Sequence, residues 1–311
     1  MNKIDIQPKF VKGLACYEGS LLAIAAARKL EYQIALSHTF GFAYTHKKNA
    51  TIGDGIKVSD SDFIGRVKKY CGLEMFSIPC NENIDGVVKK LIENGNVVGV
   101  ESNAYYCPWS YEYLKNDRWH HYLVVDFNDK GYRCIDTTMY ENFYDIDYDT
   151  FTKGFKNLNC FKINTLKEKA HYESILEESI LSIINSSCLE DLELFLVDFK
   201  DIIYEKEFSS MANSYWGCAL QRNIGFYLVG TTELYSDFIS FISTKIPNIN
   251  LSILGESIND IRDNWSILHN IILKIYYTGD DFIYGAKAND CLKSIVEKYH
   301  YVIEKVINNI I

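Results

Sequence analysis

A hairpin signal near the middle of the chain constrains the fold more than any other feature. Residues 122–127, Tyr-Leu-Val-Val-Asp-Phe, have the β-branched and aromatic composition of a strand, and residues 132–136, Tyr-Arg-Cys-Ile-Asp, continue in the same way. The four residues between them, Asn-Asp-Lys-Gly, favour a turn. Two strands joined by so short a loop are antiparallel, so the sequence predicts an antiparallel sheet.

A second constraint is a segment that is apolar on nearly every side. Residues 17–30 contain three leucines, an isoleucine and several alanines with no clear polar stripe, and a helix of this kind is usually buried within a domain. Cys16 would stand at the N-terminus of this helix. The other elements expected nearby are helices at 61–70 and 84–94 and a strand at 97–101. Helices mixed with antiparallel strands predict an α+β fold for the first half.

The charge balance changes near residue 165. Residues 1–164 carry 20 Lys/Arg and 20 Asp/Glu, whereas residues 165–311 carry 12 and 21, which accounts for the whole net charge of −9. Apolar spacing also becomes helical there, with helices expected at 209–229, 235–245, 259–277 and 286–309. We therefore predict two domains, a helix packed on an antiparallel sheet over 1–164 and an all-helical domain over 165–311.

Composition excludes several classes of protein. An acidic chain of this kind is not built to bind a nucleic-acid backbone. No apolar run approaches the roughly 18–20 residues of a membrane helix, and residues 1–12 lack the apolar core of a signal peptide. Nine scattered cysteines without a Cys-x-x-Cys pair predict reduced thiols and no structural zinc. We thus expect a cytoplasmic protein that contacts no membrane and holds no metal or cofactor.

The hairpin also suggests a pair of interacting side chains. A four-residue loop pairs Phe127 with Tyr132, and the same register then places Asp136 opposite Leu123. His121 would be the diagonal neighbour of Asp136 on the same face of the sheet, within reach of its carboxylate. A loop longer or shorter by one residue would place the two side chains on opposite faces. The register is therefore the assumption on which this pair depends.

Cys16, His121 and Asp136 together form a candidate catalytic triad. A helix N-terminus favours the thiolate of Cys16, an adjacent imidazole accepts the thiol proton, and a carboxylate fixes the tautomer of that imidazole. Each residue also has a structural explanation, as a packed thiol, one of two surface histidines and a cap on the turn that follows residue 136. The order along the chain and the shared sheet face favour the catalytic interpretation.

Three stretches within residues 10–160 resemble the butirosin-biosynthesis acyltransferase family. They are Gly13-Leu-Ala-Cys16, then Val100-Glu101 with Tyr105-Tyr106-Cys107-Pro108-Trp109, and then His121-Tyr-Leu-Val-Val-Asp126-Phe127 with Cys134-Ile-Asp136. The resemblance implies a papain-like fold that moves an acyl group from a carrier-protein thioester to an amine.

Carried over to this chain, the resemblance implies a role for each member of the triad. Cys16 would be the nucleophile, His121 the general base and acid, and Asp136 the group that orients the imidazole. The residues expected to bind substrate are Glu101, Tyr105, Tyr106 and Trp109, although the aromatic loop from 105 to 119 would serve equally well for packing. Papain-like peptidases place a glutamine several residues before the cysteine, but position 10 is Phe10, which leaves the oxyanion donors open.

The function expected from this resemblance is amide-forming acyl transfer in thiotemplated natural-product (antibiotic) biosynthesis. Cys16 would take an acyl group from the phosphopantetheine of an acyl or peptidyl carrier protein and pass it to a small amine, with the helical domain as a lid. The alternatives are a cysteine peptidase, amidase or thioesterase on the same triad, and a non-catalytic papain-like scaffold that binds an acylated carrier. The acidic second half either attracts a cationic amine or is simply a solvated helical surface.

Overall fold

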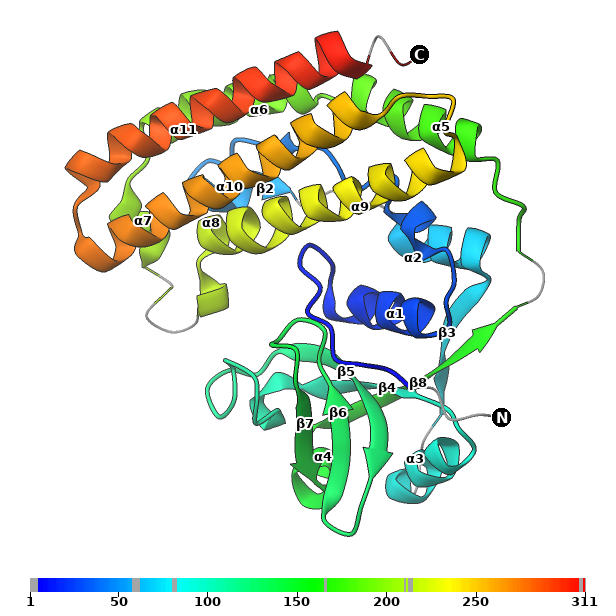
Figure 1. The fold of residues 1–311 in the computed structure, drawn as a ribbon. Coiled ribbons are helices and arrows are strands. Elements are labelled where there is room, and N and C mark those ends of the chain that lie inside the picture. The colour runs from blue at the N-terminus through cyan, green and yellow to red at the C-terminus, as the bar shows by residue number, and fades with distance from the viewer. Residues whose placement is uncertain are drawn as a thin grey trace. The chain divides into compact units, whose positions relative to one another are not determined.

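The computed structural model describes residues 5–57, 62–79, 83–164, 167–209, 211, 215–307 and 310. These residues form an α+β structure with a six-stranded antiparallel sheet and several helices. The chain divides into two compact units, Met1–Ala35 with Asp62–Lys169, and Leu36–Ser61 with Ala170–Ile311 (Figure 1). Segment 36–61 thus groups with the helical half, which differs from the expected division. Residues 165 and 166, where that division was expected, lie outside the described part.

The first unit is built on the six-stranded sheet. Its strands, in spatial order, are β3 (Leu73–Ile78), β8 (Phe155–Ile163), β4 (Val98–Asn103), β5 (Trp119–Phe127), β6 (Gly131–Ile135) and β7 (Phe143–Asp147). Every neighbouring pair is antiparallel. The predicted hairpin is confirmed as β5 and β6, whereas β3, β7 and β8 were not predicted. β8 lies between β3 and β4, a pairing between distant segments that no local pattern specifies.

Helices cover both faces of this sheet. On one face α3 (Ile84–Glu93) and α4 (Tyr148–Gly154) pack on a core that contains Tyr122 and Val124 of β5. On the other face α1 (Cys16–Ala27) packs against β5 (Figure 1), and its residues 19–25 are all buried. The predicted apolar helix is therefore confirmed, with Cys16 as its first residue. The remaining helical turns are α2 (Phe63–Arg66), a π-helical segment (Val67–Cys71), and 3₁₀ turns at Tyr32–Leu36 and Ala104–Tyr106.

The second unit is mainly helical. Its helices are α5 (Tyr172–Ile184), α6 (Cys188–Lys200), α7 (Tyr204–Phe208), α8 (Ala219–Arg222), α9 (Val229–Lys245), α10 (Ser252–Thr278) and α11 (Asp281–Tyr301), with 3₁₀ turns at Gly53–Gly55 and Tyr215–Gly217 and π-helical segments at Asn223–Leu228 and Val302–Val306. α10 packs against α9 and α11 (Figure 1). Within the described residues, no helix is both long and apolar enough to span a membrane.

Segment 36–61 contributes a two-stranded sheet, β1 (Ala43–Tyr44) and β2 (Ile56–Lys57), to the helical unit. The buried carboxylate of Glu207 accepts the backbone N–H groups of Ile52 and Gly53. The hydroxyl of Tyr44 donates to Asp198 over 2.8 Å. These long-range hydrogen bonds explain why the segment belongs to this unit, because its own strands are only two residues long.

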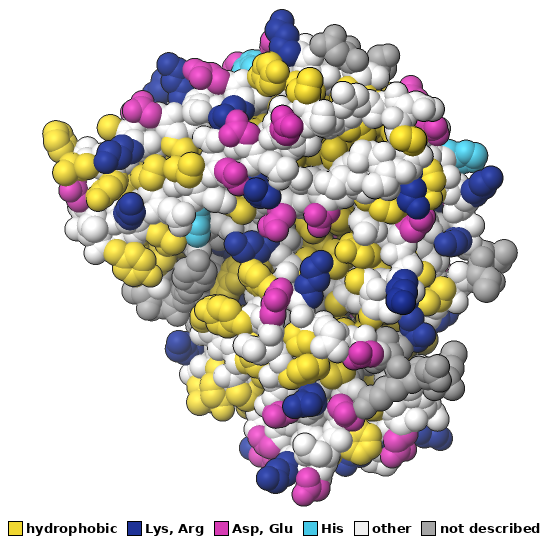
Figure 2. All heavy atoms as spheres, viewed as in Figure 1, with side chains coloured by type: hydrophobic (Ala, Val, Ile, Leu, Met, Phe, Trp, Pro, Cys, Tyr) yellow, Lys and Arg dark blue, Asp and Glu magenta, His cyan; other side chains and the backbone are white. Residues whose placement is uncertain are grey.

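Apolar side chains are exposed where α10 joins α11. Tyr277, Phe282 and Ile283 are 74%, 91% and 51% exposed. Figure 2 shows hydrophobic side chains at this end of the helical unit, and acidic and basic side chains intermixed over the same face. The helical unit therefore presents both apolar and charged surface to solvent.

Candidate active site

Cys16 occupies the first turn of α1 with its side chain half-buried. The residue before it is Ala15, whose methyl group cannot cap the helix, but Oε2 of Glu18 accepts the Ala15 N–H over 2.9 Å. The N–H of Cys16 has no acceptor within the helix because it belongs to the first turn. A partial positive charge and an orphan donor thus accompany the thiol, and both favour negative charge there.

His120 and Asp136 form a buried pair beside this helix end. Nε2 of His120 lies 2.5 Å from Oδ2 of Asp136, and the two residues are only 8% and 1% exposed. The same carboxylate oxygen accepts the indole N–H of Trp109 over 2.7 Å. Its other oxygen accepts the backbone N–H and the hydroxyl of Thr138 over 3.0 and 2.9 Å. The carboxylate is thus held by four donors, as a buried charge requires.

The thiol of Cys16 lies close enough to His120 to help raise the pKa of its imidazole. Nε2 is committed to Asp136, so Nδ1 is the ring nitrogen that the carboxylate leaves available. The imidazole therefore has a carboxylate as a partner and a thiol nearby. These are the groups that activate a cysteine nucleophile.

Opposing effects set the charge of the pair. Burial lowers the pKa of His120, but the charge of Asp136 and hydrogen bonds to Asp136 and Cys16 outweigh burial and raise that pKa well above its ordinary value. Burial likewise raises the pKa of Asp136, but the charge and hydrogen bond of His120, with the donors Thr138 and Trp109, bring it below the usual range. The arrangement therefore favours an imidazolium next to a carboxylate.

The predicted pairing of His121 with Asp136 is wrong, and His120 takes its place. The expected register holds at Phe127–Tyr132, but a β-bulge between Val124 and Asp126 then shifts it, so that Leu123 pairs with Ile135. One extra residue in β5 reverses which side chains point to each face. Because the two histidines are adjacent, this shift exchanges one for the other.

His121 points to the α1 face of the sheet and is fully buried. Its Nδ1 lies 3.0 Å from Oγ of Ser20 in α1. Burial, followed by the neighbouring charge of His120, lowers the pKa of His121 to about 4, against the opposing effects of Glu101 and Asp136. The geometry gives His121 no contact with Asp136 of the kind expected for the orienting pair, since that carboxylate is filled by other donors.

The backbone carbonyl of Cys16 is held by two hydroxyls. Oγ of Ser20 donates to it over 2.9 Å, and Oγ1 of Thr137 over 3.3 Å. α1 approaches the turn after β6 so closely that a Cβ added to Gly19 would lie 2.4 Å from Oγ1 of Thr137. The residues that follow His120 and Asp136 in sequence, His121 and Thr137, thus hold the backbone carbonyl of Cys16, through Ser20 and directly.

Glu101 lies in β4 opposite His121 and at the centre of a polar network. Its Oε1 accepts the amides of Asn159 and Asn157 over 3.0 and 3.3 Å, and its Oε2 accepts the indole N–H of Trp119 over 3.4 Å. The hydrogen-bond donors that the described residues supply to this half-buried carboxylate are all neutral. Glu101 is therefore a carboxylate without a cationic partner among them.

An aromatic edge links Glu101 to the nucleophile. The rings of Trp119 and Tyr17 meet edge-to-face at 5.8 Å, and Trp119 is 53% exposed. Trp119 directly precedes His120, and Tyr17 directly follows Cys16. A partly exposed aromatic surface therefore lies beside Cys16 and His120.

The three aromatic residues expected to bind substrate occupy different places. Trp109 packs on Tyr144 and Tyr122 at 5.0 and 5.2 Å, and its indole holds Asp136, so it supports the triad from within the core. Tyr105 and Tyr106 are half-buried in a 3₁₀ turn that packs on α4, with their rings at 5.1 Å. Trp119, at the end of the same aromatic loop, is instead exposed and lies against Tyr17.

Sequence reasoning missed several residues of the site. Ser20 lies four residues after Cys16, one helical turn on, and this spacing was a usable signal for a hydroxyl near the nucleophile. Thr138 was recognised only as part of a turn capped by Asp136, and the structure shows that this cap and the His120 pair exist together. Nothing in the sequence marks the bulge that selects His120.

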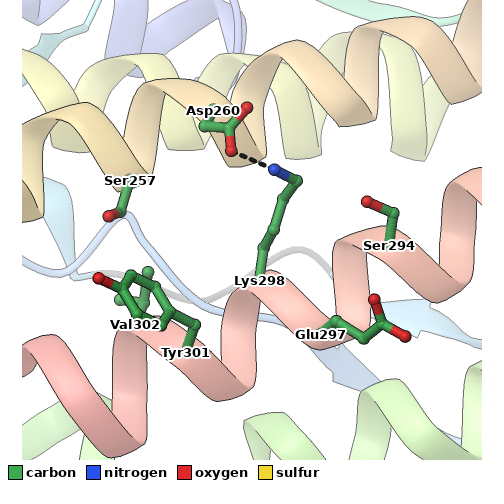
Figure 3. A pocket seen from close by; sticks show the side chains of 7 residues that line it. All are labelled: Ser257, Asp260, Ser294, Glu297, Lys298, Tyr301 and Val302. Carbon is green, nitrogen blue, oxygen red and sulfur yellow. Dashed lines mark hydrogen bonds and ion pairs between the residues drawn. The ribbon is translucent and has the colours of Figure 1, made fainter.

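The helical unit contains a separate pocket of about 320 Å³ between α10 and α11. Its lining includes Ser257, Asp260, Ser294, Glu297, Lys298, Tyr301 and Val302, and an ion pair between Lys298 and Asp260 crosses it (Figure 3). These side chains provide neither a thiol nor an imidazole. Among the described residues, no group of three or more His, Cys, Asp or Glu side chains is arranged to hold a metal ion.

Comparison with known proteins adds no assignment. No protein-family model matches the chain, and a search of curated proteins finds no match. The geometry of Cys16, His120 and Asp136 is therefore the structural observation that bears on function. Chemically, a thiol, an imidazole and a carboxylate brought together in this way can serve as nucleophile, base and orienting acid.

Proposed function

We propose that the protein is a cysteine-dependent acyltransferase that forms amides, with Cys16, His120 and Asp136 as its catalytic residues. One observation carries the proposal: Nε2 of His120 binds the buried carboxylate of Asp136, and the neighbouring thiol of Cys16 helps to raise the pKa of the same imidazole. A cysteine that served only for packing would need neither a raised imidazole pKa nor a buried carboxylate beside it.

The first half-reaction transfers an acyl group to the enzyme. The thiolate of Cys16 attacks the carbonyl carbon of an acyl-phosphopantetheine thioester, a C–S bond to Cys16 forms, and the C–S bond to the carrier thiol breaks. His120, protonated by the thiol, returns that proton to the departing carrier thiolate. The N–H of Cys16 in the first turn of α1 is a suitable donor to the oxyanion.

The second half-reaction forms the amide. A neutral amine attacks the acyl-Cys16 carbonyl, His120 accepts the proton that the nitrogen loses, and the thiolate of Cys16 leaves. Asp136 stabilises the imidazolium at this step through the bond to Nε2. A thioester is already activated for attack by an amine, so neither half-reaction requires ATP.

We propose acyl transfer rather than hydrolysis because residues 10–160 resemble carrier-dependent acyltransferases. The same resemblance implies a papain-like fold. The α+β unit, with α1 packed on an antiparallel sheet, is compatible with that fold. The donor would be an acyl or peptidyl carrier protein. For the acceptor we propose a small amine that binds along the aromatic edge, with Glu101 facing a cationic group.

The decisive experiment supplies the full chain with an acyl-pantetheine thioester, with and without a small diamine. We expect intact-protein mass spectrometry to show one acyl adduct without the diamine, and amide product with it. Peptide mapping should place the adduct on Cys16, and Cys16→Ala should abolish it. Cys291→Ser is the matched control, because Cys291 is the other half-exposed thiol among the described residues.

Each alternative predicts a different product. Free acid as the main product in the presence of the diamine would favour a thioesterase, amidase or peptidase on the same triad. Tight binding of an acylated carrier without turnover would favour a scaffold. An adduct that persists in Cys16→Ala would contradict the assignment of the nucleophile.

A further inference from the structure

We propose that His121 is a neutral positioning residue, whose Nδ1–H holds the hydroxyl of Ser20 so that Ser20 in turn holds the backbone carbonyl of Cys16. This inference rests on the proposed function, because it gives His121 a part in presenting the nucleophile. It assigns a role to a fully buried titratable side chain that the reaction itself does not use.

A continuous set of hydrogen bonds joins the sheet to the nucleophile. Nδ1 of His121 lies 3.0 Å from Oγ of Ser20, and that hydroxyl donates over 2.9 Å to the carbonyl oxygen of Cys16. Ser20 is itself fully buried. The first turn of α1 is therefore tied to β5 through His121, while the preceding residue of β5, His120 on the opposite face, is the proposed base.

The proton count fixes the tautomer of His121. A serine hydroxyl has one proton, and Ser20 uses it on the Cys16 carbonyl. Nδ1 must then be the donor to Oγ, which leaves Nε2 as a lone pair. Nε2 is buried without a hydrogen-bond partner. A buried acceptor without a donor is more common in proteins than a buried N–H without an acceptor, so the tautomer with its proton on Nδ1 is the favoured one.

The surroundings of His121 keep it uncharged. The groups that face it are His120 on the same strand, Glu101 on β4 and Asp136 after β6, and from α1 the neutral Ser20. Burial lowers the pKa of His121 first and the positive charge of His120 lowers it further, to about 4, while the two carboxylates oppose this only in part. A second imidazolium beside His120 would repel the first.

Gly99 makes room for the ring. A Cβ at this position in β4 would lie 2.7 Å from Nε2 of His121. The ring is thus packed directly against backbone on the side away from Ser20, where no water-sized space accompanies Nε2. This packing holds Nδ1 in line with Oγ of Ser20.

The rate of alkylation of Cys16 by iodoacetamide tests the proposal without any substrate. The variants are His121→Asn, which keeps an N–H near the Nδ1 position, His121→Leu, which removes it, and Ser20→Ala. His171→Leu serves as the matched control, because it removes an exposed imidazole in the helical unit. Peptide mapping separates Cys16 from the other thiols.

We expect His121→Leu and Ser20→Ala each to slow alkylation about tenfold, the effect of losing one hydrogen bond to a reacting group. The alkylation rate of the double variant should be no lower than that of either single variant, because both substitutions break the same set of hydrogen bonds. His121→Asn should retain the rate within about twofold, and no variant should move the pH midpoint of the profile. Wild-type alkylation in His121→Leu, or a shifted midpoint, would overturn the proposal.

Nitrogen-15 spectra of the imidazoles give a second test that does not depend on folding of the leucine variant. We expect His121 to appear neutral with its proton on Nδ1 at pH 7, and Ser20→Ala to perturb that signal. A proton on Nε2 would refute the assignment. Failure of acyl transfer alongside the expected alkylation pattern would refute the proposed function while leaving the positioning role intact.

Discussion

Nε2 of His120 lies 2.5 Å from Oδ2 of Asp136, and the two side chains are buried together beside the first turn of α1. Burying two charges costs several kcal/mol each unless every oxygen and N–H finds a partner. Here the indole of Trp109 and both donors of Thr138 complete the carboxylate. A buried ionic pair with this desolvation cost, next to a half-buried thiol, is typical of a functional site.

The two adjacent histidines should respond differently to the same substitution. We expect His120→Asn to slow acylation of Cys16 by an acyl-pantetheine thioester about 10³-fold, because it removes the general base. His121→Asn should change it by less than about threefold, since an amide keeps the donor to Ser20. Single-turnover acylation followed by mass spectrometry measures both. The opposite ranking would contradict the assignment of His120 as the base.

Trp109→Phe should separate support of Asp136 from core packing. Phenylalanine keeps an aromatic ring against Tyr144 but removes the N–H that donates to Oδ2 of Asp136. A hydrogen bond to a charged group contributes about 1.5–3 kcal/mol, so we expect the acylation rate to fall about tenfold or more. Thermal unfolding provides the control, since a large drop in Tm would indicate lost packing instead.

The buried pair should give stability a characteristic pH dependence. Because the pKa of Asp136 is lowered in the fold, Asp136 stabilises the folded state at pH values above its ordinary pKa of about 3.9, and this stabilisation is lost as the pH falls through the folded pKa. Because the pKa of His120 is raised, His120 stabilises the folded state at pH values below its ordinary pKa of about 6.5, and this stabilisation is lost as the pH rises through the folded pKa.

Asp136→Asn should therefore cost most stability between about pH 4 and 6.5, on the order of 3 kcal/mol. The cost should shrink as His120 loses its proton at higher pH. Urea unfolding at a series of pH values measures the difference from wild type. A difference that is flat with pH would contradict an ionic pair at this position.

Gly19→Ala tests the close approach of α1 to the turn after β6. The added methyl group would lie 2.4 Å from Oγ1 and 3.0 Å from Cβ of Thr137, so the first turn of α1 must shift. We expect a loss of about 1–3 kcal/mol in unfolding free energy, as for overpacking, and slower alkylation of Cys16. Combining it with Thr137→Ala should recover part of both. Ala23 is already alanine, which shows that the helix itself tolerates a methyl group.

Glu101→Gln tests the acceptor site. We expect the KM for a diamine acceptor to rise about tenfold, since the variant removes the negative charge facing the cation. The KM for a neutral amino alcohol of equal length and the rate of Cys16 acylation should remain unchanged. Glu93→Gln, an exposed carboxylate on α3, is the control. Equal effects on both acceptors would show that Glu101 serves only its Asn157 and Asn159 network.

In the β5–β6 hairpin, the sequence predicts the loop but not the full register. The turn residues between Phe127 and Tyr132 predict the loop and the pairing of both flanking positions, and the structure confirms them. Two residues further on, the bulge near Val125 changes the register. A bulge has no reliable local signal, because it depends on how the whole twisted sheet accommodates its neighbours. His120 is consequently a residue that the sequence named only as one of two.

The sequence by itself determined the elements with strong local signals, namely the apolar helix that begins at Cys16, the β5–β6 hairpin and the helical character of the second half. Only the tertiary structure decided which histidine meets Asp136, that β8 enters the sheet between β3 and β4, and that segment 36–61 joins the helical unit. The physical reason is range. Turn propensity and apolar periodicity act over a few residues, whereas register, strand order and the partners of a buried carboxylate depend on segments that meet only after the chain has folded.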